Sequence, residues 1–548
     1  MAEKNRLSEE QQKIVACKGN VVVNARPGSG KTFTIVEKIT NILKPLPPHK
    51  GIIAISYTNK ASDEILRRIK TKNIDLKSSF FGTMDKLYIS ELIIPFSVFL
   101  TGKIMQPIFK KIKDLPEQFQ ALQNLGLNPS AEEELLINKA LQEGYIILGK
   151  TGEFAYYIIT KVKKAADYIV ARYSAIFIDE YQDCGEAQHA LFNHLISLGL
   201  TGIAVGDLDQ AIYGYESKKP DYLHKLMAHD SFNKFNLSKN YRCHKTISDY
   251  SLALFNDPCI KEQTKDTRVI EVDVAGDERQ VCHQIDKYLP QIIKHYSELC
   301  ETPINYNQVA ILVRNRRTGQ LVDSCLKTPH KYFCPTPFDD SSEECDRIFK
   351  ELTRMCVSSS QSAIEYAESY YSEEYDGKKL KKLYRLVNAL IKIDDPITNL
   401  KNNIDKFVEI ASFLLIDRKK ADIDISKLTQ VLNDEEMLNS FKDPKEEEIN
   451  IMTMHAAKGL EYEIVFHLNL CNYEMPSYNS IKGDENEWIQ DINLHYVTIT
   501  RAINVCYLIV NSLRTKNDGQ ITQAEPSLFL SLNNSLSQMR RKVKWQQK

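Results

Sequence analysis

The chain has few of the features that mark secreted, membrane or highly basic proteins. Its 548 residues contain no apolar stretch near the roughly 18 residues that cross a bilayer, and its first eight residues lack an apolar signal segment. Lysine plus arginine number 71 and aspartate plus glutamate 72, so no overall positive field attracts nucleic acid. We therefore expect a cytoplasmic protein with no membrane partner, whose contacts with anionic molecules are local.

Glycine, proline and closely spaced cysteine pairs are also scarce. With 21 Gly, 19 Pro and 43% hydrophobic residues, the composition is that of a folded globular protein. Even the densest group of the 12 cysteines lacks the close pairs that zinc or iron–sulfur clusters favour, so we interpret the cysteines as reduced thiols. This group is Cys325, Cys334, Cys345 and Cys356. A chain of this length exceeds one hydrophobic core and predicts several domains.

Short apolar runs alternate with helical patterns, which is typical of an α/β fold with buried parallel strands. The runs are residues 21–23, 52–55, 175–178, 203–205, 309–313, 464–468 and 506–510. Two charged segments with helical spacing interrupt the alternation, at 86–174 and 315–448. The pattern predicts two α/β lobes, each a parallel sheet flanked by helices with a mainly helical insertion. We interpret the basic tail, 540–548, as a solvated helix end.

A glycine-rich segment lies between the first apolar run and a helical pattern, the context that a P-loop requires. It reads Asn24-Ala25-Arg26-Pro27-Gly28-Ser29-Gly30-Lys31-Thr32. Small residues let backbone N–H groups close around phosphates at a helix N-terminus. The segment from Ala25 to Thr32 is therefore the candidate nucleotide site, with Lys31 on the β- and γ-phosphates and Thr32 on Mg²⁺. An ordinary glycine-rich turn is the alternative.

Acidic residues follow the apolar run 175–178, in the order Asp179-Glu180-Tyr181-Gln182-Asp183. Carboxylates at the carboxyl end of a parallel strand lie where ligands bind. Asp179 is expected to hold Mg²⁺, and Glu180 to orient and deprotonate water. The alternative is an acidic loop without a catalytic role.

The pattern A-x-x-G-S-G-K-T followed by D-E-x-Q-D resembles the signature of the UvrD/Rep/PcrA-like DNA helicases of superfamily 1. The resemblance extends from Leu7 to about residue 510, with gaps at the two helical segments. It implies two RecA-like P-loop lobes and an enzyme that hydrolyses ATP with Mg²⁺. Leu7-Ser8 followed by Gln11 resembles the family's Q motif, which implies that Gln11 pairs with adenine.

Three further segments of the first lobe resemble family motifs that meet DNA or the γ-phosphate. Residues 56–61 and 82–83 resemble segments that touch single-stranded DNA, which implies contacts from Tyr57 and Thr83. Residues 205–215 resemble V-G-D-x-D-Q-S-I-Y-x-W, so Gln210 is implied to sense the γ-phosphate. Tyr213 and Tyr215 would then stack on bases, and core positions are the alternative for both.

Two segments resemble the beginning of the family's second lobe. Residues 237–242 end in Asn240-Tyr241-Arg242, which implies that Tyr241 lies against adenine and that Arg242 is an arginine finger. Residues 310–314 resemble A-I-L-x-R, whose basic end, here Arg314, faces DNA in the family.

The last two motifs complete the implied site. Residues 450–461 resemble T-x-H-x-A-K-G-L-E. This implies that Thr453 and His455 contact the DNA backbone and that Glu461 contacts the ribose. The alternative for His455 is a purely structural role. Residues 496–502 resemble Y-V-A-x-T-R-A, which makes Arg501 a second arginine finger. The implied catalytic residues are thus Lys31, Asp179, Glu180, Gln210, Arg242 and Arg501.

The resemblance also implies domain boundaries. The first lobe is expected at 1–85 with 175–235, and the second lobe at 236–314 with 449–515. The two insertions are expected at 86–174 and 315–448, and the tail at 516–548. The second insertion is shorter than in full-length housekeeping helicases, and the tail is too short for a nuclease domain.

The implied function is an ATP-dependent helicase or translocase on single-stranded or tailed DNA. The family's 3′ to 5′ polarity is carried over, since no residue here establishes it independently. The alternative is a DNA-sensing ATPase subunit that regulates a partner nuclease. Compact UvrD-like chains of this kind resemble the helicase subunit of Gabija-type anti-phage systems, which works with an OLD-family nuclease.

Overall fold

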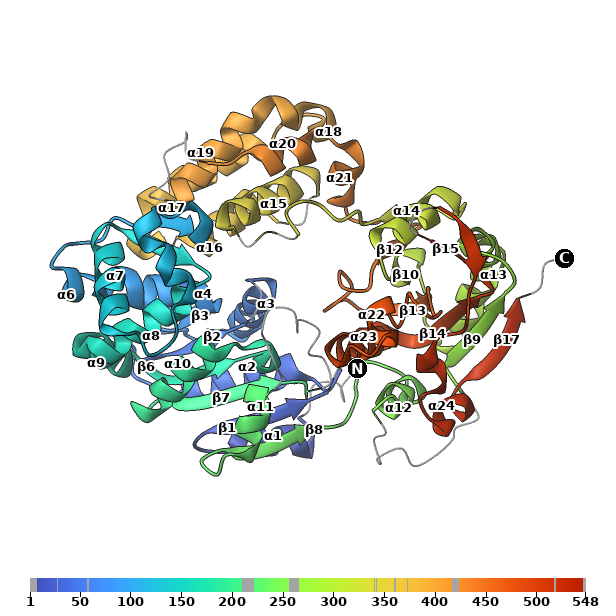
Figure 1. The fold of residues 1–548 in the computed structure, drawn as a ribbon, viewed down its shortest axis with the longest axis horizontal. Coiled ribbons are helices and arrows are strands. Elements are labelled where there is room, and N and C mark those ends of the chain that lie inside the picture. Colours follow the sequence, from blue (N-terminus) through green and yellow to red (C-terminus); the bar gives the residue numbers. More distant parts are fainter. Residues whose placement is uncertain are drawn as a thin grey trace. The chain divides into compact units, whose positions relative to one another are not determined.

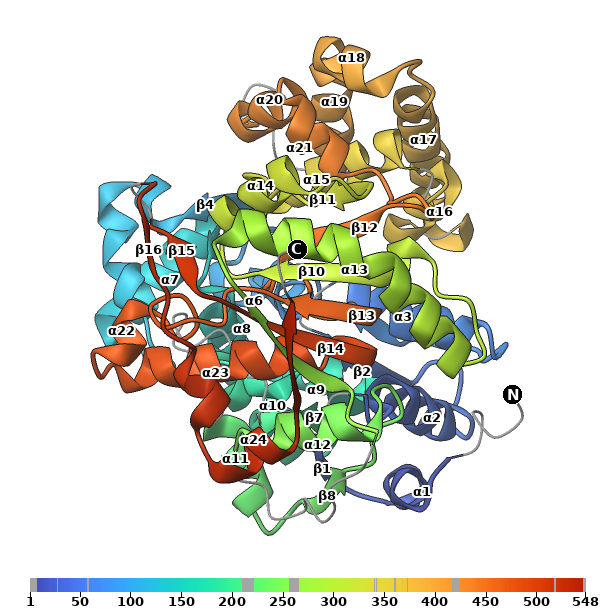
Figure 2. The ribbon, with the colours of Figure 1, turned by 90° about the vertical axis from the view of Figure 1, so that its right-hand side faces the viewer.

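In a computed structural model, the chain divides into two compact units, Met1–Arg242 and Cys243–Lys548. The structure describes residues 7–26, 28–56, 59–208, 221–255, 266–339, 341, 343–358, 361–371, 373–415, 423–516 and 519–545. Figures 1 and 2 show that each unit combines a sheet with surrounding helices. Over these ranges, no helix is both long and apolar enough to cross a membrane.

The first unit contains a parallel sheet with the strand order β3-β2-β6-β7-β1-β8. Its strands are β1 (Val21–Ala25), β2 (Gly51–Ile55), β3 (Phe80–Gly82), β6 (Tyr173–Ile178), β7 (Thr201–Gly206) and β8 (Asn233–Leu237). In register, Val21 of β1 lies between Ile203 and Asn233 of its two neighbours. All five residues of β2 are buried, as expected for a sheet covered on both faces.

Alternate residues of the central strands enter two different cores. Val21 and Val23 pack with α1 (Glu9–Ala16), α2 (Lys31–Leu43) and α3 (Asn59–Lys70), whereas Val22 packs with the core of the opposite face. That second core takes side chains from α8 (Thr151–Lys161), α10 (Glu186–Ser197) and α11 (Asp221–Ala228). The apolar runs of the sequence are thus strands that are buried on both faces.

The segment between β3 and β6 is mainly helical. It comprises α4 (Met84–Leu87), the π-helix η2 (Tyr88–Ile93), α5 (Ile94–Phe96), α6 (Val98–Thr101), α7 (Ala131–Gln142), α8 and α9 (Lys163–Arg172). A short parallel pair that the sequence did not predict, β4 (Ile108–Lys111) with β5 (Tyr145–Leu148), lies within it. Strand β6 begins directly after α9.

The second unit contains a larger parallel sheet with the order β11-β12-β10-β13-β14-β9-β17. Its strands are β9 (Val269–Val274), β10 (Val309–Val313), β11 (His330–Tyr332), β12 (Ile449–Thr453), β13 (Tyr462–His467), β14 (Ala502–Asn511) and β17 (Arg541–Trp545). A small antiparallel pair, β15 (Leu513–Thr515) and β16 (Ile521–Gln523), follows β14. The parallel sheets agree with the α/β fold predicted from the apolar runs.

The helices of the second unit fall into two sets. The first set is close in sequence to the strands of the sheet. It contains α12 (Lys245–Ala253), α13 (Glu278–Leu299), α14 (Arg316–Cys325), α22 (Tyr478–Ile481), α23 (Glu485–Ile499) and α24 (Asn534–Gln538). Those between β11 and β12 are α15 (Glu344–Val357), α16 (Ala363–Tyr370), α17 (Glu373–Ile391), α18 (Pro396–Asn399), α19 (Ile404–Leu414), α20 (Ser426–Leu432) and α21 (Glu435–Ser440).

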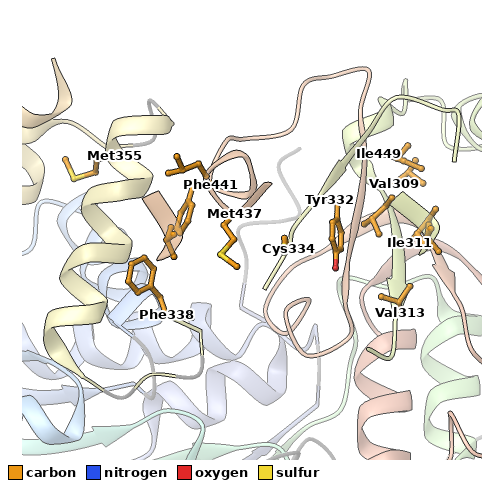
Figure 3. Close-up of a cluster of buried hydrophobic side chains, with 14 of the residues drawn as sticks. Val309, Ile311, Val313, Tyr332, Cys334, Phe338, Met355, Met437, Phe441 and Ile449 are labelled. Carbon is orange, nitrogen blue, oxygen red and sulfur yellow. The ribbon is translucent and has the colours of Figure 1, made fainter. Parts of the chain in front are cut away.

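One continuous apolar cluster joins the sheet of the second unit to the helical segment (Figure 3). Val309 and Ile311 of β10 are fully buried at one end of it. Tyr332 and Phe338 follow along the chain, and Met437 of α21 belongs to the helical end. The helical segment therefore shares its core with the sheet.

The C-terminal end corrects the sequence interpretation, because residues 541–545 form the edge strand β17 and not a solvated helix end. Trp545 is only 8% exposed, and its ring stacks on Tyr288 with centroids 5.0 Å apart. Arg540 and Lys542 both pair with the buried Glu271 of β9. The alternation in Lys-Val-Lys-Trp, apolar residues inward and lysines outward, is the signal of this strand.

Candidate active site and nucleic-acid interface

The loops that carry the candidate residues of the first unit all leave the carboxyl ends of its parallel strands. Following the sheet order, these loops begin at Thr83, Ser56, Asp179, Asp207, Arg26 and Ser238. Because parallel strands end at one edge of a sheet, residues far apart in the chain meet there. The P-loop lies beside the acidic loops, and Thr83 lies toward the other end of the row.

The P-loop connects β1 to α2 and contains two left-handed glycines. Gly28 has φ 69° and Gly30 has φ 78°, values that favour glycine. A Cβ atom on Gly28 would lie 2.7 Å from Cβ of Arg242, so the close approach of that segment also requires glycine. Gly30 caps the 13-residue helix α2 without a side-chain hydrogen bond, which leaves backbone N–H groups for an anion.

The rest of the predicted P-loop set lies around this turn. Ala25 is buried at the end of β1, and the Arg26 amide donates to the Leu237 carbonyl over 3.2 Å. Ser29 is buried, and Thr32 is half-buried in the first turn of α2. The small residues predicted from the sequence therefore form a compact turn at the start of α2.

Gln11 is brought to the P-loop by helix α1. Its Nε2 donates to the Ser29 carbonyl over 3.2 Å, and its Oε1 accepts from the Ser8 amide over 3.0 Å. The second bond belongs to a capping box that fixes the start of α1. A Cβ atom on Gly30 would lie 2.6 Å from Nε2 of Gln11. The predicted adenine contact and the phosphate loop are thus in direct contact.

Lys31 forms an ion pair with the predicted catalytic base. Its Nζ lies 2.8 Å from Oε1 of Glu180, and both side chains are largely buried. Glu180 Oε2 accepts from Nε2 of Gln182 over 2.6 Å, and Gln182 Oε1 accepts from the Asp207 amide over 2.9 Å. Gln182 is fully buried. The carboxylate is therefore connected both to the P-loop and to the end of β7.

Burial and charge shift the pKa values at this centre. Burial disfavours the charged form of Lys31, but the carboxylates of Glu180, Asp179 and Asp207 outweigh it, so the pKa of Lys31 is raised. Burial raises the pKa of Asp179, and the neighbouring Lys31 partly offsets that rise. The ammonium group of Lys31 thus lies among several carboxylates.

The residues present fit a nucleotide with a hard divalent cation. Asp179 is 7% exposed at the carboxyl end of β6 and supplies a carboxylate, and Thr32 supplies a hydroxyl oxygen. Oxygen ligands of this kind, completed by phosphate oxygens and water, are those that Mg²⁺ prefers. The uncapped start of α2 and the buried Lys31 suit the phosphates themselves.

Tyr241 and Arg242 lie in the unit that carries the P-loop, which differs from the expected lobe boundary at 235/236. The Tyr241 amide donates to the Gly28 carbonyl over 2.7 Å, so the segment after β8 folds back over the P-loop. The Tyr241 ring is 48% exposed, with Nζ of Lys239 5.0 Å from its centroid. An exposed aromatic face thus stands beside the phosphate loop.

In the second unit, predicted DNA contacts follow the adjacent parallel strands β10 and β12. Thr453 is the last residue of β12, and its Oγ1 accepts a hydrogen bond from the Ala456 amide over 3.3 Å. The exposed His455 lies in the turn that follows. Arg314 follows β10 and pairs over 2.7 Å with Asp491, whose side chain is fully buried. The other oxygen of Asp491 accepts from the Ser477 amide over 2.7 Å. Asp491 therefore fixes the direction of Arg314.

In the second unit, Arg501 is hydrogen-bonded to the turn that carries Glu461. Arg501 is 3% exposed; its Nε donates to the Val497 carbonyl over 2.9 Å and its Nη1 to the Leu460 carbonyl over 3.3 Å. The bond to Leu460 attaches Arg501 to the residue before Glu461. Glu461 itself is exposed. Arg501 thus supports the turn that presents Glu461.

Comparison with known proteins agrees with these features. The model of the UvrD/REP helicase N-terminal domain matches residues 7–143 and 132–230, and that of the UvrD-like helicase C-terminal domain matches residues 338–512. The chain belongs to the UvrD-like helicase family. As a UvrD-like helicase it is an ATP-hydrolysing enzyme that acts on DNA.

Individual relatives cover nearly the whole chain. The Gabija protein GajB of Bacillus cereus (strain VD045) is 28% identical over 92% of this UvrD-like helicase and 95% of the relative. The ATP-dependent DNA helicase PcrA of Staphylococcus epidermidis (strain RP62A) is 23% identical over 96% of this chain and 86% of its own. PcrA of Staphylococcus aureus (strain Mu50) is 22% identical over 95% and 85%.

Five predicted site residues of this UvrD-like helicase lie outside the described residues. They are Pro27, Tyr57, Gln210, Tyr213 and Tyr215. Their roles stay predictions from the motifs.

Sequence reasoning missed the residues that connect the motifs. Gln182 was noted beside the acids, but not as the bridge from Glu180 to the Asp207 amide. The buried Lys38 of α2 was missed; its Nζ donates to the carbonyls of Ile14, Val15 and Cys17 at the end of α1. A lysine inside an otherwise apolar helix face was the only signal for it.

Proposed function

We propose that this UvrD-like helicase moves 3′ to 5′ along single-stranded DNA and couples ATP hydrolysis to strand separation. One observation carries the proposal: Lys31, Glu180 and Gln182 form a continuous polar chain that ends at the Asp207 amide. These polar contacts link the phosphate loop to the segment that precedes the predicted DNA-stacking residues. A change at the phosphates is thereby passed to the DNA-binding side.

In this proposal, the nucleotide is held by the residues of the P-loop edge. Gln11 and Tyr241 receive the adenine, the turn from Gly28 to Thr32 receives the phosphates, and Glu461 of the second unit receives the ribose. Mg²⁺, held by Thr32 and Asp179, neutralises phosphate charge when bound. Lys31 leaves Glu180 for the phosphates, and Glu180 becomes free to accept a proton from the attacking water.

Charge on the transferred phosphoryl group is neutralised by Gln210, Arg242 and Arg501 in the same proposal. Single-stranded DNA passes over Tyr57, Thr83, Tyr213, Tyr215, Thr453 and His455. Base stacking tolerates any sequence, which suits a motor that must step along arbitrary DNA.

We also propose the four-part domain organisation of the family. The sheets at 1–85 with 175–235 and at 236–314 with 449–515 form the two motor lobes, and the helical segments 86–174 and 315–448 act as accessory domains. The mainly helical content of both segments supports this division.

The first test is phosphate release with and without single-stranded DNA, for the wild type and for Lys31→Ala at one salt concentration. Removing Lys31 deletes the phosphate contact, so we expect DNA-stimulated hydrolysis in the wild type and its loss in the variant. Hydrolysis that DNA does not stimulate, in an enzyme that binds ATP, would contradict the motor.

Polarity is tested separately with duplexes that carry one single-stranded tail. Unwinding of the 3′-tailed duplex but not of the 5′-tailed duplex is expected. The reverse preference would leave the ATPase proposal intact and reject the direction.

A second candidate function is favoured by the relative GajB, which matches over 92% of this chain. In this alternative, the chain is a DNA-sensing ATPase subunit of an anti-phage complex and regulates a partner nuclease. DNA-stimulated hydrolysis without unwinding, together with co-purification of a nuclease encoded beside the gene, would favour the alternative. Unwinding by the isolated chain would favour the autonomous motor.

A further inference from the structure

Strand β17 (Arg541–Trp545) is the last strand of the sheet in the second unit. Within the described part of the chain it pairs with β9 alone, in parallel. Figure 1 shows it as the outermost strand of this sheet. Because backbone groups of a strand point alternately to its two sides, some N–H and C=O groups of β17 face away from β9. This edge therefore offers hydrogen bonds to a further strand.

The exposed side chains of this edge are cationic. Arg541, Lys542 and Lys544 are exposed, whereas Val543 is half-buried and Trp545 is buried. The apolar side chains thus hold the strand on the sheet, and the cations surround its open side.

The carboxylates beside this edge do not balance its charge. Glu271 of β9 pairs with Arg540 and Lys542, and Asp273 pairs with Lys542 over 3.3 Å. Among the described residues, Lys544 forms no ion pair with a carboxylate. Two carboxylates thus stand against the four cations of this segment, so the edge keeps a net positive charge.

A cleft of about 620 Å³ opens at the carboxyl ends of β9, β14 and β17. Val510, Ala524 and Pro526 give it apolar lining, and Lys542 and Lys544 contribute cations. Its volume lies in the range of ligand-binding pockets. The edge that offers backbone groups therefore also borders a site that can receive side chains.

The alternation along β17 sets what a neighbouring strand would need. Lys542 and Lys544 lie on one face, and Val543 and Trp545 lie on the other, where they join the apolar core. Side chains directly opposite on a paired strand are about 5 Å away. Acidic residues at every second position would meet the lysines, and apolar residues between them would extend the apolar face.

We propose that β17 docks an extended acidic segment of a partner protein, which joins the sheet as a further strand. Strand addition takes its affinity from main-chain hydrogen bonds and its specificity from pockets for alternate side chains. The open edge supplies the hydrogen bonds, and the cleft supplies the pocket. The net positive charge selects an acidic strand.

The same charges disfavour other occupants. Lysines on an edge keep copies of one strand apart, so two β17 edges would repel each other. A nucleic-acid backbone would meet the lysines, but it has no row of main-chain donors and acceptors to match a strand edge. The proposal goes beyond the motor function, since it uses neither the nucleotide site nor the predicted DNA contacts.

The test measures binding of a fluorescently labelled eight-residue peptide, in which glutamate and valine alternate, to the full-length protein by fluorescence anisotropy. Saturable binding by the wild type is expected without nucleotide or DNA. The same peptide with N-methylated backbone amides retains its charge but cannot donate main-chain hydrogen bonds. Its affinity should be lower by about tenfold or more.

The edge itself is tested with Lys544→Glu, which reverses a charge beside the cleft and should lower the affinity for the alternating peptide by about tenfold. Lys234→Glu is the matched control, because Lys234 is an exposed lysine on β8, an edge strand of the first unit's sheet. Its affinity should equal that of the wild type. Unfolding midpoints in urea should match for all three proteins, because both side chains are exposed.

Several results would overturn the proposal. They are an absence of saturable binding by the wild type, equal losses in Lys544→Glu and Lys234→Glu, and equal affinity for the N-methylated peptide, which would reduce the interaction to charge attraction. A wild-type dimer that Lys544→Glu dissociates in sedimentation would assign the edge to a second copy of the chain. Complete displacement of the peptide by single-stranded DNA would assign it to nucleic acid.

Failure of the proposed function is recognised separately. Phosphate release with and without single-stranded DNA is measured for the wild type and Lys544→Glu. Wild-type stimulation by DNA together with weakened peptide binding is expected for the variant. Absence of stimulation in the wild type rejects only the motor, because the peptide assay contains neither ATP nor DNA.

Discussion

At the scale of single residues, the proposed catalytic carboxylate lies on a strained backbone. Glu180 has φ 54°, a left-handed conformation that costs roughly 1–2 kcal/mol for a residue with a Cβ atom. The bonds from Lys31 and Gln182 hold its side chain in place. Strain of this kind persists where the surrounding contacts over-determine the conformation.

Replacing Glu180 by glutamine separates binding from hydrolysis. Because the amide cannot accept the proton from water, we expect Glu180→Gln to bind ATP while its turnover number falls by about 10²–10⁴-fold. Fluorescent-nucleotide binding and phosphate release measure the two steps. Glu186→Gln, an exposed acid at the start of α10, is the matched control and should be close to wild type. Turnover within tenfold of wild type for Glu180→Gln would assign the base to another residue.

Two buried histidines make the second unit sensitive to acid. Nδ1 of His467 donates to the Leu468 carbonyl over 3.0 Å, so its Nε2 accepts from Nδ1 of His495 over 2.8 Å. Burial lowers the pKa of His467 to about 4 and that of His495 well below its ordinary value. The neutral forms are therefore the folded forms.

The sign of the pH effect follows from these depressed pKa values. Between the ordinary value of about 6.5 and the folded value, the unfolded chain binds more protons, so stability falls as the pH is lowered. For His467 this loss should be about 2 kcal/mol at pH 5, and His495 should add to it in the same direction. His495→Asn retains a donor near Nδ1 and does not titrate, so its unfolding midpoint in urea should fall less from pH 7.5 to pH 5. His224→Asn, an exposed position, should leave the wild-type pH dependence unchanged.

At the scale of elements, a buried lysine joins the helix of the P-loop to the helix that carries Gln11. Lys38 is 3% exposed on α2, and its Nζ lies 2.9 Å from the Ile14 carbonyl at the end of α1. Burial lowers the pKa of Lys38. Because the last carbonyls of a helix lack partners within it, the lysine both caps α1 and positions it.

Lys38→Met should therefore affect ATP recognition more than chemistry. We expect the KM for ATP to rise several-fold, the turnover number to change little, and the preference for ATP over GTP to fall because α1 carries Gln11. The lost hydrogen bonds should also reduce stability by roughly 1.5–3 kcal/mol. Lys38→Arg should restore most of the preference. A stability loss with unchanged KM and nucleotide preference would make Lys38 a purely structural residue.

Strand β17 shows why some elements escape prediction. Five residues with three cations resemble a solvated tail when considered alone. Their strand conformation depends on the open edge of β9 and on the apolar surface that receives Trp545. Strand β9 lies more than 200 residues before β17 in the chain, so local propensity could not identify the pairing.

At the scale of the whole molecule, the two units contribute different parts of the proposed chemistry. The P-loop, the carboxylates and Arg242 belong to the first unit, and Glu461 and Arg501 belong to the second. Hydrolysis in the proposed mechanism thus depends on both units of one chain.

Arg501→Ala tests that dependence. Arginine fingers contribute on the order of 10³-fold or more, so we expect DNA-stimulated turnover to fall by about that factor while ATP still binds. Arg279→Ala removes an exposed arginine of the same unit and should have little effect. A loss of ATP binding with little change in turnover would instead mean that Arg501 acts by supporting the turn at Glu461.

The sequence by itself determined the α/β class, and it predicted a nucleotide site. Lys31, Asp179 and Glu180 could be proposed for that site because a P-loop and an acidic strand end need particular residue types directly after apolar strands. Parallel strands then bring such strand ends to one edge, whatever the distance along the chain. Periodicity likewise predicted the central strands, since burial on both faces demands continuous apolar runs.

Only the tertiary structure decided which distant polar groups meet. The bridge through Gln182, the cap that Lys38 places on α1 and the pairing of Arg314 with Asp491 each join segments whose spacing in the chain carries no pattern. The same holds for the fold-back of Tyr241 over Gly28. Local patterns specify an element and its faces, whereas these contacts depend on how whole elements pack together.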